Sequence, residues 1–346
     1  MKQEKEKNPR LGKVGGQAVL EGVMMRSGEN VALSVRKLDG TVTTKTSRFV
    51  SAKQKHPILG KPIIRGVVSF IESLTMSFST MSDSVDMLGL EEEEETKFEK
   101  WLKEKFGKSA LDVLMPLAIL LGVALALAIF FFAPTYAGIL LGKLFRFGEV
   151  GQSISASIVK IIIFIVYMIL ISMLKDIRRT FEYHGAEHKS IFCYESGEEL
   201  TVDNVRKQSR FHPRCGTSFM FVMLLLGLIF AVAARLIITY GIGFVIENTL
   251  LKTLFYMGIS LLILLPLVTG VGYEFLMYAG KHDNAFVRVC SAPGLWMQRI
   301  TTKEPDDGQM EVAITALKAA MPDEFPPEAP ETPTEEAPDA TEETNV

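Results

Sequence analysis

The sequence predicts a mainly α-helical, polytopic membrane protein with four transmembrane helices, a small N-terminal α+β region and a disordered acidic C-terminal tail. Three observations support this fold class. Apolar residues gather in four long blocks between residues 111 and 278, and residues 31–50 show the pattern of a β-hairpin. Residues 304–346 hold thirteen Asp/Glu and one Lys, so the net charge of −3 divides into −12 for this tail and +9 for the rest. The apolar blocks exclude an ordinary soluble fold.

The four apolar blocks are long enough to cross a bilayer. A hydrocarbon core about 30 Å thick needs about 20 helical residues, because a helix satisfies its own backbone where water is absent. The blocks are Leu111–Phe132, which stops at Pro134, then Ile154–Leu174, Thr217–Tyr240, and Leu250 to about Val271, which fades through Glu274 to Tyr278. Helices of soluble proteins seldom stay apolar on all sides for this length. Lys160 and Arg235 fall near block ends, where long basic side chains reach the interface.

Lysine and arginine placement predicts the orientation of the spans, because cytoplasmic flanks carry the excess of these residues. Five lysines lie between residues 97 and 108, and eight Lys/Arg lie between residues 175 and 216. The connection between the first two spans holds only Lys143 and Arg146, and Gly241–Thr249 holds none. Both termini and the 175–216 loop are therefore predicted to be cytoplasmic. The predicted partner is the lipid bilayer, and no nucleic acid is expected.

The same orientation places Cys193, Cys215 and Cys290 on the cytoplasmic side. An odd number of cysteines in that compartment indicates reduced thiols or metal ligands rather than disulfides. No cleavable signal peptide is expected, because the charged Met1–Arg10 leads into the Gly-rich Gly12–Gly22 instead of an apolar core.

The flanks of the spans divide into predicted segments. Residues 1–110 form a cytoplasmic N-terminal region with a hairpin at about 31–50, an amphipathic helix at about 62–88 and a juxtamembrane helix at about 97–108; residues 111–278 form the membrane body; residues 279–321 form a cytoplasmic helical segment; residues 322–346 form the acidic tail. Ser, Thr and Asp oppose the apolar stripe of the 62–88 helix, which favours docking on the protein's own bundle over insertion among anionic headgroups. The Pro- and Glu-rich tail is expected to be disordered and is a candidate binding segment for a cytoplasmic protein.

Three of the five histidines fall within 29 residues of the 175–216 loop. The stretch His184-Gly-Ala-Glu187-His188 is a His-x-x-Glu-His motif, the inverted relative of the zinc-protease signature. If the second span continues as a helix, His184 and His188 lie one turn apart and can share a divalent metal, for which zinc is the best match. Glu187 is then placed to accept a proton from a metal-bound water, which makes it the candidate catalytic base.

Three further residues are candidates to complete the metal shell: His212 and Cys215, shortly before the third span, and Glu274 near the end of the fourth. If His212 and Cys215 both bind, the site is closed and structural. If only one of them or Glu274 binds, one position stays open for water. A plain hydrogen-bond network among these side chains is the alternative to metal binding.

The Gly-rich segment Gly15–Arg26 has no assigned chemistry. It lacks the Gly-Lys-Ser/Thr of a phosphate loop and does not match a dinucleotide fingerprint. Small residues bracket Glu21 and Arg26, so the segment either approaches a polar site closely or shapes a turn.

Together these motifs resemble the YqhQ-like family of bacterial multi-pass membrane proteins of unknown function, which are described as predicted metal-dependent enzymes. The matching stretches are Gly15–Arg26, Lys61–Gly66, Glu182–His188, His212–Thr217, Gly272–Glu274, and Pro293–Gln298 running into Thr301–Pro305. The resemblance covers roughly residues 12–320 and implies a bacterial cytoplasmic membrane. It supplies neither a reaction nor a ligand set.

The leading functional hypothesis is a membrane-embedded, divalent-metal-dependent enzyme, most simply a hydrolase, acting at the cytoplasmic membrane face on a lipid headgroup or a membrane-proximal peptide. The alternative is a non-catalytic scaffold or assembly factor whose His/Cys cluster is structural. A transporter is less favoured, because Lys160, Arg235 and Glu274 all fall near span ends instead of at the membrane midplane.

Overall fold

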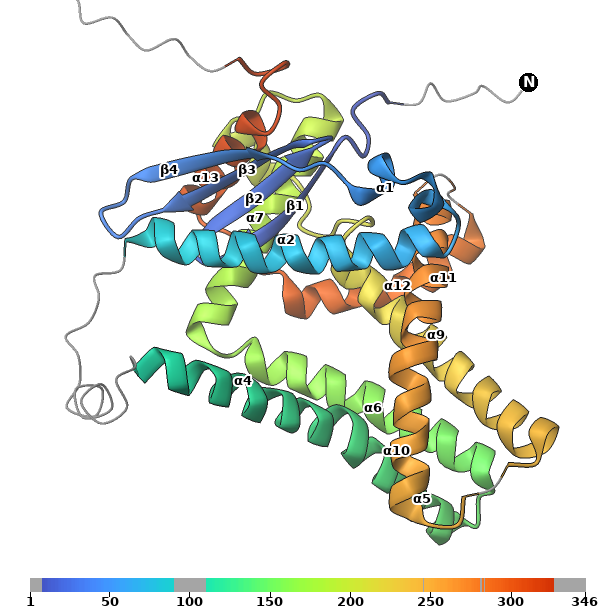
Figure 1. Cartoon of the computed structure of the whole chain (residues 1–346). Helices are drawn as coiled ribbons and strands as arrows, with labels where there is room; N and C mark the ends of the chain where they lie inside the picture. The colour runs from blue at the N-terminus through green and yellow to red at the C-terminus, as the bar shows by residue number, and fades with distance from the viewer. Residues whose placement is uncertain (1–7, 90–109, 245, 281, 283, 327–346) are drawn as a thin grey trace, which may run out of the picture.

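A computed structural model describes residues 8–89, 110–244, 246–280, 282 and 284–326. Within these residues, a β-sheet with its covering helices forms a body at one end of several long apolar helices (Figure 1). The predicted juxtamembrane helix at about 97–108 and residues 327–346 of the predicted tail lie outside the described residues.

The sheet is antiparallel and has the strand order β1-β2-β3-β4. Its strands are β1 (Val14–Val19), β2 (Gly22–Ser27), β3 (Asn30–Arg36) and β4 (Val42–Arg48). Strands β3 and β4 confirm the hairpin predicted at 31–50, and Gly40 takes the positive φ of 86° that its turn requires. The β1–β2 hairpin corresponds to Gly15–Arg26. Alternation did not predict it, because residues 22–25 of β2 are buried in succession, as in a strand covered on both faces.

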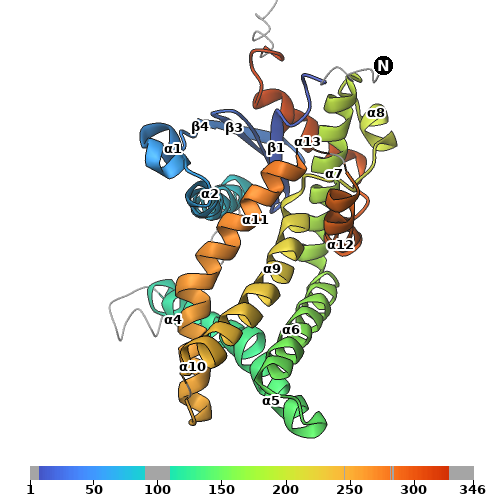
Figure 2. The same cartoon turned by 90° about the vertical axis from the view of Figure 1, so that its right-hand side faces the viewer.

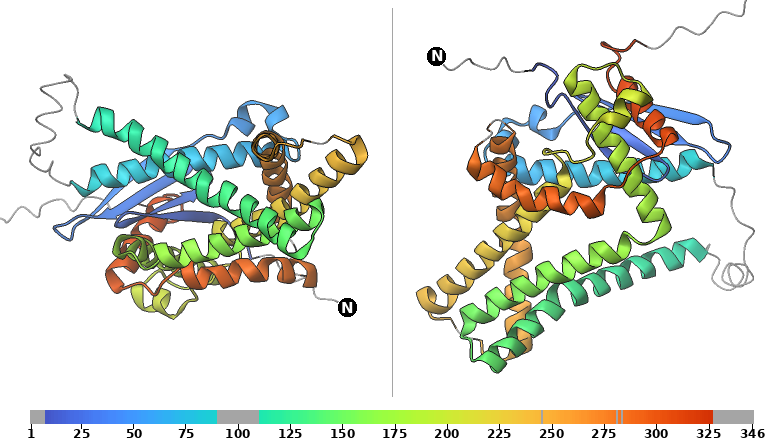
Figure 3. Two further views of the ribbon diagram at one scale, coloured as in Figure 1. Left: turned by 90° about the horizontal axis from the view of Figure 1, so that it is seen from below. Right: turned by 180° about the vertical axis from the view of Figure 1, so that it is seen from behind.

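Helices cover both faces of the sheet. Helices α7 (Lys175–Ser196) and α13 (Asp307–Ala319) pack on one face, and α13 lies alongside α7 when the molecule is seen from behind (Figure 3). Helix α2 (Ile64–Leu88), which fits the helix predicted at about 62–88, runs across the other face (Figure 1). Two cores result, one between the sheet and α7/α13, and a smaller one under α2.

Helix α2 presents its small polar residues, not its apolar stripe, to the protein. Thr80 and Ser84 are buried, whereas Ile71 and Phe78 are 57% and 78% exposed. The small residues allow α2 to lie close to the sheet and to α11. Helix α2 therefore packs on the protein's own α11 and sheet, as expected, but mainly through its small residues; Leu88 is buried, whereas most of the apolar stripe faces outward.

Four helical segments are long and apolar enough to cross a membrane, which confirms the predicted number. The first comprises α4 (Ala110–Leu127), the π-helical η2 (Ala128–Phe132) and α5 (Ala133–Phe145); the second is α6 (Glu149–Ile171); the third comprises α9 (Gly216–Leu236) and the π-helical η3 (Ile237–Ile242); the fourth comprises α10 (Thr249–Ile259), the π-helical η4 (Ser260–Leu264) and α11 (Leu265–Ala279).

Two span boundaries differ from the prediction. The first span does not stop at Pro134, because this proline falls in the first turn of α5, where its missing N–H is tolerated, and the helix continues to Phe145. The second span begins at Glu149, five residues before the predicted Ile154. Lys160 is therefore the twelfth residue of a 23-residue helix. Its placement near the start of the span was wrong.

The second span does not continue into the motif helix, since residues 172–174 separate α6 from α7. Figure 2 shows α7 above the end of α6. After the fourth span, α12 (Ala285–Thr301) packs against α9, and a short segment, residues 302–306, leads to α13. Residues 322–326, the predicted start of the disordered tail, are ordered instead: Phe325 packs on the core, and Glu324 accepts a hydrogen bond from Tyr194.

Candidate metal centre

His184, His188 and Cys215 converge at the side of the sheet body that carries α7. The two histidines lie one turn apart on α7, with ring centroids separated by 4.4 Å. Cys215 directly precedes α9. One ligand atom from each of the three residues lies within 4.8 Å of the other two. The side chains of this His/His/Cys cluster come from two segments that the sequence had singled out.

Backbone carbonyls fix both imidazole rings. His184 Nδ1 lies 2.8 Å from Thr301 O, and His188 Nδ1 lies 2.6 Å from Arg210 O. A carbonyl can only accept, so Nδ1 carries the proton in each ring and Nε2 keeps its lone pair. His184 Nε2 lies 3.3 Å from Cys215 Sγ, and His188 also bonds the Cys215 side chain. Metal-binding histidines characteristically donate their second N–H in this way.

Two segments distant in sequence supply those carbonyls. Residues 301–305, which we call the strap, cross α7 at Gly185, where a Cβ atom would lie 2.0 Å from Lys303 O. Lys303 N–H donates to Phe181 O at 2.8 Å, which ties the strap to the helix. The fully buried Gln298 side chain holds the other segment, because it bonds both the N–H and the C=O of His212 at 2.8 Å.

These contacts explain residues to which the sequence assigned no role. Gly185 permits the strap to approach, and Gln298 and Thr301 lie in the stretch Pro293–Pro305, noted only for its resemblance to a family. Their contacts with the site involve backbone atoms and join residues more than 80 positions apart. The types of side chain in the sequence therefore gave no signal of this role.

Glu187 lies beside the cluster and is 5% exposed. Gly16 N–H of β1 donates to its carboxylate, and a Cβ atom on Gly16 would lie 2.9 Å from Glu187 Cγ. The second carboxylate oxygen, Oε2, is buried and has no hydrogen-bond partner among the described residues. Burial raises the pKa of Glu187 to about 7, although the charge of His184 and the Gly16 N–H both act to lower it. A buried polar atom without a partner calls for an unseen ligand or water.

Burial also lowers the pKa of His188 below its usual value, and the charge of neighbouring His184 acts in the same direction. Hydrogen bonds with Cys215 and Arg210 O act against this lowering. The net effect favours the neutral imidazole, which is the form that binds metal ions.

The structure places the other two predicted ligands outside the cluster. His212 Nε2 lies 3.6 Å from the Glu195 carboxylate, and its Nδ1 accepts the Arg214 N–H at 3.3 Å. Glu274 accepts hydrogen bonds from Arg65 Nε at 2.8 Å and from Ile63 N–H at 3.2 Å. Glu274 therefore has partners of its own, whereas His212 Nε2 is buried near Glu195 without a hydrogen bond among the described residues. Cys215 is the third residue of the cluster.

Some residues of the Gly15–Arg26 segment hold the hairpin in place, and another contacts the candidate site. Glu21, in the β1–β2 turn, accepts hydrogen bonds from Arg179 and Tyr183 of α7. Arg26 donates to Gly28 O and lies over the Phe49 ring. Glu21 and Arg26 thus anchor the hairpin, whereas Gly16 brings β1 against Glu187.

A cleft of about 850 Å³ opens beside the cluster. His184, Glu187, His188 and Cys215 lie on its wall, together with residues 12–18 and part of α2. Strand β1 is an edge strand, and no other strand in the described ranges pairs with its outer edge. The partly exposed His184 therefore lines the cleft beside an edge strand, whose Gly16 N–H is taken up by Glu187.

The donor set fits a zinc-class divalent ion. Two imidazoles and a thiolate are three of the usual zinc ligands, and a tetrahedral ion with bonds of about 2.0–2.3 Å needs neighbouring ligand atoms about 3.5 Å apart. The His184 Nε2–Cys215 Sγ distance of 3.3 Å matches this requirement. Three protein ligands leave the fourth position for water or substrate, as in catalytic zinc sites.

Comparisons with known proteins place the chain in a family. A family model described as "Protein of unknown function (DUF1385)" matches residues 61–323. The chain belongs to this family. It is also 32% identical over 315 residues to the "Uncharacterized protein YqhQ" of Bacillus subtilis (strain 168), covering 89% of this chain and 92% of that protein. No solved structure matches the chain. The matched range includes the cluster, the strap and all four candidate spans.

Proposed function

We propose that this protein is a membrane-anchored, divalent-metal-dependent hydrolase. The observation that carries the proposal is the convergence of His184, His188 and Cys215 on a cleft wall, with both Nδ1 atoms already bonded to carbonyls. A structural site would need four protein ligands, and neither of the further predicted candidates, His212 and Glu274, belongs to the group of ligand atoms that lie within 4.8 Å of one another. The bound metal would supply a water of lowered pKa and polarise the bond to be cleaved.

Glu187 is the proposed catalytic base. It lies three residues after His184 on the same helix, and residues at this spacing are neighbours on the helix surface. Gly16 N–H holds one side of its carboxylate, and Oε2 has no protein partner among the described residues. Glu187 is thus oriented without being neutralised by an ion pair.

The proposed substrate is a membrane-proximal peptide segment rather than a lipid headgroup. The outer edge of β1 forms the cleft wall next to Glu187, and a strand edge binds extended peptides by adding a strand to the sheet. Gly15 and Gly16 are exposed there, so a peptide backbone can approach without side-chain obstruction. The basic flanks of the spans support a cytoplasmic position for this cleft and for both termini in a bacterial cytoplasmic membrane.

Metal content and peptide cleavage test the proposal together. The protein is purified in detergent without chelator, and bound metals are quantified by mass spectrometry for wild type, His184→Ala and Glu187→Gln. We expect one metal per wild-type chain, at least a tenfold loss in His184→Ala, and retention in Glu187→Gln. A peptide library reconstituted with the protein is then searched for cleavage products, which Glu187→Gln should reduce at least a hundredfold.

His282→Ala is the matched control, because this exposed histidine bonds only Tyr278 and contacts its ring. It should retain both metal and activity. Metal-free wild type overturns the metalloenzyme. If the protein retains metal, yields no peptide products and releases phosphate or fatty acid from vesicle lipids, the substrate is a lipid and not a peptide.

A further inference from the structure

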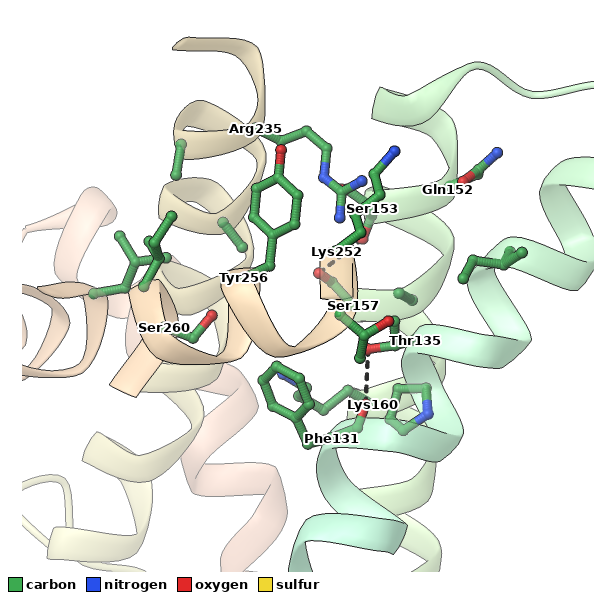
Figure 4. Close-up of a pocket in the computed structure, with 18 of the residues that line it drawn as sticks. Phe131, Thr135, Gln152, Ser153, Ser157, Lys160, Arg235, Lys252, Tyr256 and Ser260 are labelled. Carbon is green, nitrogen blue, oxygen red and sulfur yellow. Dashed lines mark hydrogen bonds between the residues drawn. The ribbon is translucent and has the colours of Figure 1, made fainter. Parts of the chain in front are cut away.

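A polar pocket lies among the membrane-spanning helices, far along the chain from the metal centre. Helices α5, α6, α9 and α10 line it, at the end of the spans remote from the sheet (Figures 1 and 4). Its volume is about 190 Å³, room for about six water molecules. Hydroxyl and amide side chains line it: Thr135, Gln152, Ser153, Ser157, Thr253 and Ser260. Such a lining is unusual in segments of this hydropathy.

Three basic side chains from three different helices meet at this pocket. They are Lys160 of α6, Arg235 of α9 and Lys252 of α10 (Figure 4). Glu149 at the start of α6 pairs with Lys252, lies 3.9 Å from Arg235 and accepts a hydrogen bond from Thr239 at 3.0 Å. Two of the three basic side chains, Lys252 and Arg235, therefore share the Glu149 carboxylate.

Lys160 has no carboxylate partner among the described residues. Its recorded contact is with the face of the Phe131 ring, 5.6 Å from Nζ to the centroid. Lys160 lies eleven residues from the start of α6, which is about 16 Å at 1.5 Å per residue. Ionisable residues inside apolar spans are rare and usually mark a functional site, because an isolated charge is costly there.

Departures from regular helix surround the same pocket. The π-helical turns η2 and η4 contribute Phe131, Ser260 and Leu264 to its wall, and η3 begins two residues after Arg235. A π turn inserts a residue into a helix, and such turns occur frequently at functional sites. Three of the four candidate spans carry one.

We propose that this pocket binds a singly charged phosphate group, for which the basic side chains on its wall, above all Lys160, supply the positive charge. Three cations face the carboxylates of Glu149 and Glu247, so one positive charge remains, and the unpaired one is Lys160. Lysine and arginine are the side chains that bind phosphate oxygens. The volume suits a phosphate group but not acyl chains. The source is either the phosphodiester of an anionic lipid or free phosphate, and the site does not depend on the proposed hydrolase.

Ligand-dependent thermal stability of the detergent-purified full-length protein tests the site. One arm adds inorganic phosphate, with chloride at equal ionic strength as its reference. The other adds short-chain phosphatidylglycerol, with phosphatidylcholine of equal chain length as its reference. We expect phosphate, the anionic lipid or both to raise the melting temperature of wild type until the effect saturates. In Lys160→Met the ligand concentration needed for half of this effect should be at least tenfold higher. The arm that responds identifies the source.

Lys160→Met also supplies a folding control. Without phosphate, removal of the uncompensated charge should leave the melting temperature equal to or above that of wild type, so a failure to fold cannot imitate lost binding. Lys143→Met is the matched control, because Lys143 is exposed on α5 and does not line the pocket. It should respond to phosphate as wild type does. Equal responses of wild type and Lys160→Met, or no response in either arm, overturn the proposal.

Discussion

The metal centre and the membrane pocket are both polar groups of side chains in a largely apolar chain, but they are incomplete in opposite ways. Around His184, His188 and Cys215, both imidazole Nδ1 atoms already bond carbonyls, and the ligand atoms converge to within 4.8 Å of one another. Around Lys160, the charged group itself is present and its partner is missing among the described residues. The first region is preorganised for a cation, and the second has a surplus of positive charge.

This difference teaches how each site can be recognised. Spacing on one helix reveals the metal centre, because two histidines four residues apart must share a face. No local pattern reveals the pocket, because its basic residues lie on three helices and each alone resembles an interfacial lysine or arginine. The predictions below test the contrast, beginning with the largest effect.

Loss of a cluster residue should have the largest effect. Cys215→Ala and His188→Ala should each lower bound metal at least tenfold, measured by elemental mass spectrometry of purified protein. His212→Ala should retain the metal, because His212 faces Glu195 and not the cluster. If His212→Ala also loses the metal, the shell includes His212 and the site is closed.

Disturbing the strap should weaken the metal centre without touching a ligand. Gly185→Ala places a Cβ atom against Lys303 O and should displace the neighbouring Thr301 carbonyl from His184. Metal affinity, measured by competition with a chelator, should fall about 10- to 100-fold. Gly227→Ala is the control, since nothing lies within 4 Å of a Cβ atom in that span. Equal affinities would show that the ring orientation does not depend on the strap.

Glu195 should make the body that carries the His/His/Cys cluster sensitive to acid. Burial acts to raise its pKa, but the nearby His212 and hydrogen bonds from Gly12 N–H and Arg214 prevail and lower it to about 2, from an ordinary value of 4.5. A lowered folded pKa stabilises the fold fully above about pH 4.5, and this contribution is lost as the pH falls toward 2.

Glu195→Gln should therefore destabilise the protein by about 1–3 kcal/mol at pH 7 and flatten the loss of melting temperature between pH 5 and pH 3. Glu198→Gln, at an exposed position on the same body, should leave the wild-type profile unchanged. A wild-type pH profile in Glu195→Gln would contradict the assignment.

In the membrane pocket, Glu149→Gln should remove the charge shared by Arg235 and Lys252. Glu149 is 28% exposed, so we expect a smaller loss, about 1 kcal/mol, seen as a lower melting temperature. Added phosphate should restore part of it, because an anion replaces the lost carboxylate. Glu247→Gln, at the exposed rim, should have less effect.

The smallest effect should be that of Lys160→Met on metal binding. The two regions share no residue, so the stoichiometry and affinity for metal should equal those of wild type. A change in metal affinity would mean that the two regions are coupled through the spans. They would then form one site and not two independent ones.

Much of the fold follows from local sequence. Apolar blocks of this length have few alternatives to spanning helices, and Asp39-Gly40 between β-branched residues specifies a tight hairpin turn. The first hairpin was missed because Val23, Met24 and Met25 form a continuous apolar run and not an alternating one. Lys160 was misplaced because the polar start of α6, residues 149–153, hid the true helix end.

The candidate site, like the fold, was predictable in part. Local spacing placed His184 and His188 together, but it could not choose between His212 and Cys215, which lie three residues apart. That choice depends on Glu195 and Gln298, which hold His212 away from the cluster. Gln298 lies 86 positions from His212, beyond the reach of pattern reasoning.

The position of the strap after the fourth candidate span gives the cluster an order of assembly. All three cluster residues have been synthesised once the ribosome passes Cys215, whereas Gln298 and Thr301 follow more than 80 residues later, after two further spans. A nascent chain that has just finished its third span carries the thiol and both imidazoles without the Thr301 carbonyl that orients one of them. The hydrogen bonds around the cluster are thus complete only after residue 301 has been synthesised.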